Sequence, residues 1–127
     1  MAIIYSFPRK DSNPMLEISN RSALYVSPKE PYKKWAKLCN QESEEELDLR
    51  LKENHVYLID IITDDDLKDI LLPYYGKIFE FELQSWNYLE KEWPQNRSIN
   101  DFLDWFDVKL SFWVFDLENE EIEREED

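Results

Sequence analysis

Residues 56–86, VYLIDIITDDDLKDILLPYYGKIFEFELQSW, carry the clearest structural signal in this chain of 127 residues. The first seven, 56–62, are almost continuously apolar and are β-branched or aromatic. Such a run predicts a strand that is buried on both faces near the centre of a sheet. The acids of 64–66 suit the first turn of a helix, because the helix dipole favours negative charge there. The segment therefore predicts a strand followed directly by a helix.

Apolar residues recur along this helix at the spacing of one buried face. The main stripe is Leu67, Ile70, Leu71, Tyr74, Ile78 and Phe81, and it is widened by Phe79, Leu83 and Trp86. Pro73 falls inside the pattern, where its missing N–H and its ring are incompatible with an unbroken helix. We expect the helix to kink at Pro73 or to split in two.

Shorter elements are predicted on both sides of this segment. Strands are expected at 2–7, 22–27 and 108–117. Pro31 suits the first turn of one helix, and Ser43 and Ser98 have the spacing of capping residues for two more. Residues 43–52 also alternate as a strand would, but the capping signal favours a helix. Residues 87–97, which include Trp93-Pro94, are expected to form a loop.

These elements predict an α/β fold, with α+β as the alternative. We expect a layered sandwich in which helices pack on a small mixed sheet of three to four strands. Residues 1–117 fit one globular domain, since domains most often run roughly 100–150 residues. Residues 118–127 contain seven acids and one Arg, so they predict a disordered acidic tail.

The composition excludes several classes of function. The formal net charge is −14, which repels nucleic acids and anionic membrane surfaces. The single Gly excludes phosphate-binding glycine loops. No stretch approaches the roughly 20 apolar residues of a membrane span, and the N-terminus does not have the pattern of a signal peptide. We therefore expect a cytoplasmic protein without nucleic-acid or membrane partners.

Few residues offer the chemistry of a catalytic or metal site. His55 is the only histidine and Cys39 the only cysteine, so neither a zinc site nor an intrachain disulfide is expected. Asp60 and the acids of 64–66 could ligate Mg²⁺ or Ca²⁺. The spacing matches no calcium loop, however, and capping of the helix accounts for the latter three. No metal, cofactor or catalytic residue is predicted.

The most distinctive part of the sequence is the region of Trp93-Pro94, Arg97 and the stretch 102–107, FLDWFD. Trp105 lies off the apolar face of its predicted helix. It either packs beneath the loop of 87–97 or forms an exposed patch with Trp93 and Arg97. Trp and Arg are enriched at binding hot spots, and Arg97 could make a cation–π contact with either ring. We therefore treat Trp93, Arg97 and Trp105 as candidate binding residues.

A set of scattered motifs gives the chain a resemblance to a known group. The motifs are Asn20-Arg21-Ser22-Ala23, Pro28-Lys29, the run 31–35, Tyr57-Leu58, Trp86, Trp93-Pro94, Arg97 and the run 102–107. In combination they resemble an uncharacterised family of short acidic bacterial proteins over about residues 18–117. The resemblance implies a bacterial cytoplasmic origin and no known activity.

Two functions are compatible with these observations. The first is a non-enzymatic protein-interaction module, an adaptor or a neutraliser of a basic partner. A homodimer is also compatible with the spare aromatic residues and strand edges. The second is a small ligand-binding domain or enzyme with a pocket between sheet and helices. In that case Arg21 and Lys29 would bind an anionic group, and Asp60 or His55 would act as acid or base. The second function requires these four residues to converge in one cleft.

Overall fold

A three-stranded antiparallel sheet forms the centre of the fold, in the spatial order β3-β2-β4. The computed structural model describes residues 17–18, 20–39 and 43–125. The sheet strands are β2 (Arg21–Pro28), β3 (His55–Asp60) and β4 (Phe106–Ser111), and a separate two-stranded pair joins β1 (Glu17–Ile18) to β5 (Phe115–Asp116). The predicted combination of helices with a small sheet is confirmed. Its described strands all pair antiparallel, so the expectation of a mixed sheet was wrong.

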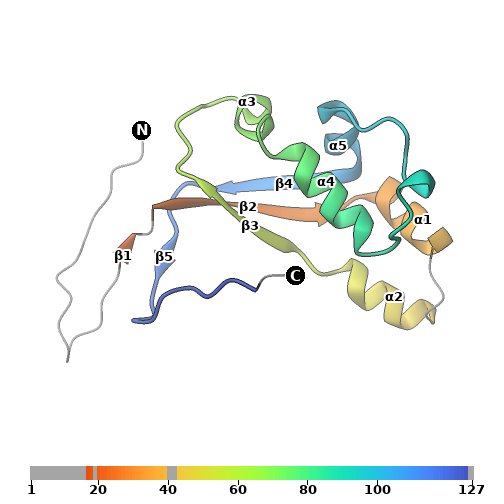
Figure 1. Ribbon diagram of the computed structural model, residues 1–127, viewed down its shortest axis with the longest axis horizontal. Helices are drawn as coiled ribbons and strands as arrows, with labels where there is room; N and C mark the ends of the chain where they lie inside the picture. The colour runs from red at the N-terminus through yellow and green to blue at the C-terminus, as the bar shows by residue number, and fades with distance from the viewer. Residues whose placement is uncertain (1–16, 19, 40–42, 126–127) are drawn as a thin grey trace.

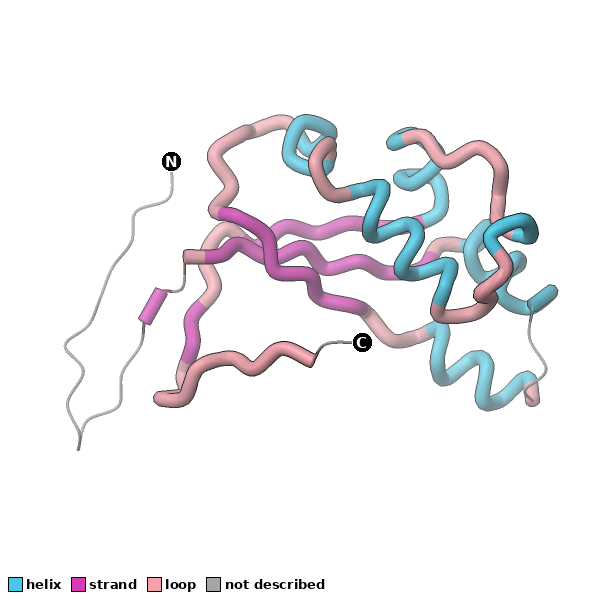
Figure 2. The backbone as a smooth tube through the Cα atoms, in the orientation of Figure 1, coloured by secondary structure: helices cyan, strands magenta, loops and turns pink. Residues whose placement is uncertain are grey.

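The helices are α1 (Glu30–Cys39), α2 (Glu44–Leu51), α3 (Leu67–Leu71), α4 (Tyr75–Gln84) and α5 (Ile99–Trp105), with a 3₁₀ turn η1 (Glu90–Glu92). Figure 1 shows α3, α4 and α5 above the sheet, and α1 and α2 beyond its right-hand end. The chain after β5 runs below the sheet, on the side away from α4 (Figure 2). The structure thus has a helical layer on one sheet face only. The strand predicted at 2–7 lies outside the described residues.

The strand register defines the two faces of the sheet. Leu24 of β2 lies opposite Tyr57 of β3 and Leu110 of β4, and side chains of directly paired residues point to the same face. We call this face, which meets the helices, the inner face. Its residues are Ser22, Leu24, Val26, Pro28, His55, Tyr57, Ile59, Phe106, Val108 and Leu110. The opposite set, which we call the outer face, is Arg21, Ala23, Tyr25, Ser27, Val56, Leu58, Asp60, Asp107, Lys109 and Ser111.

An aromatic cluster joins the helices to the inner face. Phe79, Phe102 and Phe106 are almost fully buried, and their ring centroids lie 5.1–5.7 Å apart. Tyr32 of α1 joins them, with its ring centroid 4.8 Å from that of Phe106. Fully buried aromatic rings are among the largest single contributions to core stability. This cluster fixes the helical layer on the sheet.

Strand β3 differs from its prediction. The run 56–62 predicted a central strand buried on both faces, but β3 is an edge strand paired only with β2. Val56 and Leu58 are 53% and 46% exposed, whereas Ile59 on the inner face is 5% exposed. The apolar run therefore combines one buried face with one apolar face that is exposed to solvent. From the sequence alone, this arrangement looks the same as a strand that is buried on both faces.

Pro73 splits the long helical segment into α3 and α4, as the sequence predicted. Asp66 caps α3, and its side chain accepts hydrogen bonds from the N–H groups of Lys68 and Asp69. Because the helix starts again after the break, α4 buries Ile78, Phe79, Glu82 and Leu83. Phe81, expected in the buried stripe, is 59% exposed. The expectation for Phe81 assumed one continuous helical phase, which the break removes.

The other predicted helix starts are confirmed by their capping geometry. Ser43 accepts a hydrogen bond from the N–H of Glu46 at the start of α2. Ser98 and Asp101 form a complete capping box at the start of α5. The hydrogen bonds from Ser98 also hold the pKa of the Asp101 carboxyl below its ordinary value. The strand predicted at 108–117 is interrupted, with β4 ending at Ser111 and β5 starting at Phe115.

Candidate functional site

The outer face of the sheet has no helix packed on it (Figure 1). Tyr25, Val56 and Leu58 are 41%, 53% and 46% exposed on this face. Tyr25 and Val56 are directly paired, and Leu58 lies two residues further along the same strand. Exposed apolar residues scattered singly are ordinary, whereas contiguous ones mark interaction sites. These three side chains form what we call the outer patch.

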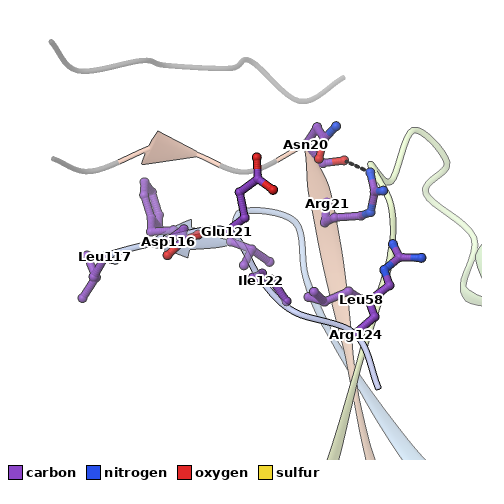
Figure 3. Close-up of a pocket in the computed structure, with 10 residues that line it drawn as sticks. Asn20, Arg21, Leu58, Asp116, Leu117, Glu121, Ile122 and Arg124 are labelled. Carbon is purple, nitrogen blue, oxygen red and sulfur yellow. Dashed lines mark hydrogen bonds between the residues drawn. The ribbon is translucent and has the colours of Figure 1, made fainter. Parts of the chain in front are cut away.

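A pocket of about 850 Å³ extends the outer patch toward the chain segment after β5. Leu58 lines it together with Phe115, Leu117 and Ile122, which are 48–70% exposed. Figure 3 shows Arg21 and Arg124 on one side of this pocket, with Arg21 donating a hydrogen bond to the Asn20 carbonyl oxygen. The apolar surface therefore continues from the sheet onto the C-terminal segment.

Charges on the outer face itself are balanced, since Arg21 and Lys109 share it with Asp60 and Asp107. The acidic excess lies around it. The described segment 118–125 carries five glutamates and one arginine, all exposed. Exposed acids also flank β3, with Glu53 before it and Asp64 to Asp66 after it. The acidic excess therefore lies at the two ends of β3 and in the C-terminal segment, beyond the mixed charges of the outer face itself.

A second polar site lies between α4 and the inner side of β3. The Glu82 side chain is 4% exposed, and its Oε2 lies 2.6 Å from Nδ1 of His55. The hydroxyl of Tyr57 donates a hydrogen bond to the same oxygen. Burial and the nearby Glu82 charge raise the pKa of Tyr57 above its ordinary value. Burial and the same carboxylate raise the pKa of Tyr32, whose hydroxyl donates to the Glu82 carbonyl at 2.7 Å.

This cluster satisfies a buried carboxylate, as buried charge requires. Its chemistry is that of a carboxylate that orients a histidine, an arrangement used for general bases and for metal ligands. No Ser, Thr or Cys side chain is hydrogen-bonded to His55 among the described residues. Nor do the described residues contain a group of three or more His, Cys, Asp or Glu that could hold a metal ion. The contacts of Glu82 with His55 and Tyr57 therefore hold β3 against α4.

The four residues suggested for an anion-binding or catalytic cleft do not converge. Arg21 and Asp60 are paired at one end of the sheet. His55 lies at the other end of β3, on the inner face, and Lys29 follows the far end of β2, where its Nζ donates to the Leu103 carbonyl. An extended strand rises about 3.3 Å per residue, so the eight residues from Arg21 to Lys29 span roughly 26 Å. The enzyme hypothesis loses the geometry on which it depended.

The structure brings Trp93 and Arg97 together. The Arg97 guanidinium carbon lies 5.6 Å from the Trp93 ring centroid, and its Nη1 donates to the Pro94 carbonyl. Trp93 is 9% exposed, and its indole N–H donates to the carbonyl of Asn87. Trp105 packs separately, against Trp35 and Phe79. Cation–π and packing contacts within the fold thus occupy these side chains, and a binding role for them stays a prediction.

Neither the role of Glu82 nor the outer patch was predicted from the sequence. Glu82 has a recognisable signal, because it lies four residues after Ile78 and three after Phe79 and so shares their buried face. Tyr25 and Val56 carry no comparable signal. Their exposure depends on which sheet face the helices cover, and this is decided by the tertiary fold.

Comparison of the chain with protein-family models, curated proteins and solved structures finds no match. The resemblance to a family of short acidic proteins therefore stays a prediction, and the function is inferred from the structure. Among the described residues, no helix is both long and apolar enough to cross a membrane.

Proposed function

We propose that this protein is a non-enzymatic protein-interaction module that binds its partner through the outer face of the sheet. The observation that carries the proposal is the outer patch. Tyr25, Val56 and Leu58 are 41–53% exposed in adjacent register positions, on the one sheet face that no described helix covers.

Leaving this apolar surface in water costs free energy. Burial of apolar surface contributes about 25 cal/mol per Å², so three neighbouring large side chains gain free energy when a partner covers them. The pocket beside Leu58 adds further apolar area from the C-terminal segment. A core of apolar residues with a charged rim is the usual anatomy of a protein interface.

The chemistry of the partner follows from charge. The chain has a net charge of −14, and Asp116 and Glu121 line the pocket beside Leu58 together with Arg21 and Arg124. A partner with basic side chains around an apolar centre would be attracted to this field and would associate faster at low ionic strength. We therefore propose a basic protein partner, with this chain as its adaptor or neutraliser.

The test is affinity capture from native cell extract with wild-type protein and two charge variants. Val56→Asp places a carboxylate in the outer patch. Leu72→Asp is the matched control, since Leu72 is 63% exposed at the end of α3 in the helical layer. We expect Val56→Asp to reduce capture of a stoichiometric partner at least about tenfold, a loss of roughly 1.4 kcal/mol, and Leu72→Asp to leave it unchanged.

High salt separates the charge contribution from the apolar one. Capture should weaken at 1 M salt, where the Debye length falls to about 3 Å. Failure to recover any stoichiometric partner at low salt would contradict the proposal. Equal capture by wild-type protein and Val56→Asp would also contradict it, because binding would then use another surface.

A further inference from the structure

The free edge of β3 has a feature that the outer patch alone does not explain. The backbone N–H of Asp60 donates to the hydroxyl of Tyr74 at 3.3 Å, so it points away from β2. N–H groups alternate in direction along a strand. The N–H and C=O groups of Val56 and Leu58 therefore point to the same free edge as those of Asp60, and no described strand pairs with them.

Exposed apolar side chains lie on both sides of this edge. Val56 and Leu58 stand on the outer face. On the inner side, Phe81 of α4 makes an edge-to-face contact with Tyr57 at 6.2 Å between ring centroids. Phe81 is nevertheless 59% exposed, so much of its ring extends past the cover that β3 provides. An extended segment added along β3 would place alternate side chains beside Val56 and Leu58 and beside Phe81.

The other edge of the sheet is protected. Natural sheets discourage strand addition by placing charged side chains along an edge strand. Strand β4 carries Asp107 and Lys109 in the middle of its outer face. Across β2, Val56 occupies the position that corresponds to Lys109 of β4, and Leu58 the position that corresponds to Ser111, so β3 has an apolar residue where β4 has a charged one. Of the two edges, β3 is the one suited to pairing.

We infer that β3 binds an extended segment of a basic partner protein by strand addition, which deepens the proposed function and depends on it. The segment alternates apolar residues with Lys or Arg. Its backbone pairs with Val56 and Leu58, its apolar side chains cover the outer patch, and the alternate basic side chains lie on the side of Phe81. Its basic side chains approach the acids at either end of β3, such as Glu53 and Asp64.

Charge distinguishes this occupant from a second copy of the chain. Pairing β3 with β3 would join two molecules of net charge −14 each, with acids at both ends of each strand. Like charges brought this close repel. A basic segment removes that repulsion and replaces it with attraction.

The experiment measures binding of short fluorescent peptides by anisotropy. The probe is an end-blocked octapeptide of alternating Lys and Val. One control exchanges Lys for Glu, which reverses the charge. The other exchanges Val for Pro, which keeps the charge but prevents strand pairing. We expect the Lys-Val peptide to bind at least about tenfold more tightly than either control, a difference of roughly 1.4 kcal/mol.

Two variants at one position test the backbone contact. Leu58→Pro removes an N–H that faces the free edge, where proline is tolerated in a strand, and Leu58→Val keeps the N–H and an apolar side chain. Leu58→Pro should weaken Lys-Val binding at least about tenfold, and Leu58→Val should not. If Leu58→Pro fails to fold, the amide chemical shifts of the wild-type protein provide the test. The peptide should change the shifts of Val56 and Leu58 and leave those of Val108 and Leu110 in β4 unchanged.

Several results would overturn the inference. One is equal binding of the Lys-Val and Lys-Pro peptides, which would indicate charge attraction alone. Another is a perturbation confined to β4, and a third is a dimer of the free protein with β3 at its interface. If these appear while Val56→Asp still abolishes capture of the natural partner, only strand addition fails. If Val56→Asp leaves capture intact, the proposed function fails as well.

Discussion

The two faces of the three-stranded sheet differ in burial. On β2, Leu24 and Val26 of the inner face are 0% and 1% exposed, while Tyr25 between them is 41% exposed. The inner face is sealed by three helices and an aromatic cluster. The outer face has similar side chains, but no described helix packs on it. The comparison teaches that apolar character alone does not mark the core, since here it serves both the core and the proposed interface.

The largest expected difference between the faces is in stability. Phe102→Ala should lower the free energy of unfolding by about 3–5 kcal/mol, because the fully buried ring leaves a cavity. Leu58→Ala on the outer face should cost under about 1 kcal/mol, since Leu58 is 46% exposed. Chemical denaturation of both variants measures the contrast. Equal losses would mean that the outer face is part of the core.

The link between β3 and the helical layer should show an intermediate effect. Glu82→Ala leaves the Tyr57 hydroxyl and His55 without their shared acceptor, which should cost about 1–3 kcal/mol of unfolding free energy. Glu80→Ala is the matched control, because Glu80 is exposed on the same helix. If both variants unfold alike in denaturant, the cluster does not hold β3 to α4.

The stability of the protein should fall at alkaline pH because of the partly buried tyrosine Tyr57 on the inner face. The pKa of Tyr57 is raised in the folded state, first by burial and then by the charge of Glu82. Above pH 10.0, its ordinary pKa, the unfolded chain loses the proton that the folded chain retains, so stability falls as pH rises. Below that pH both states are protonated and the contribution is constant.

The control for this effect is Tyr57→Phe, which keeps the ring but cannot ionise. Its unfolding free energy should decline less steeply than that of wild-type protein when both are titrated from pH 8 to pH 11 by thermal or chemical denaturation. Parallel curves for the two proteins would show that Tyr57 ionises as readily in the folded chain as in the unfolded one.

Much of the local structure was predictable, because it depends on short-range chemistry. Ser43 and Ser98 start helices through side-chain hydrogen bonds within three residues, and Pro73 ends one through its own ring. The position of β3 at an edge was not predictable. The run 56–62 is apolar throughout, and only the tertiary fold decides that its Val56 side faces solvent.

The candidate site was less predictable than the fold. Arg21 and Asp60 were named from the sequence and are indeed neighbours, but Lys29 and His55 lie far from them because β2 and β3 are extended. Trp93 was named because Trp is enriched at binding hot spots. A Trp that packs within the fold has the same residue type, so the sequence does not distinguish the two roles. The outer patch arises from the register between two strands, β2 and β3, which the spacing of residues within one strand does not specify.

The most direct test of the account is amide hydrogen exchange in β3, measured residue by residue with and without the captured partner. In the free protein, the amides of Val56 and Leu58 should exchange quickly, while that of Tyr57, directed toward β2, should be protected. Binding of the partner should slow hydrogen exchange at the amides of Val56 and Leu58 and leave the exchange of the other β3 amides unchanged. Protection of these two amides in the free chain, or no change on binding, would contradict a partner that pairs with the open edge.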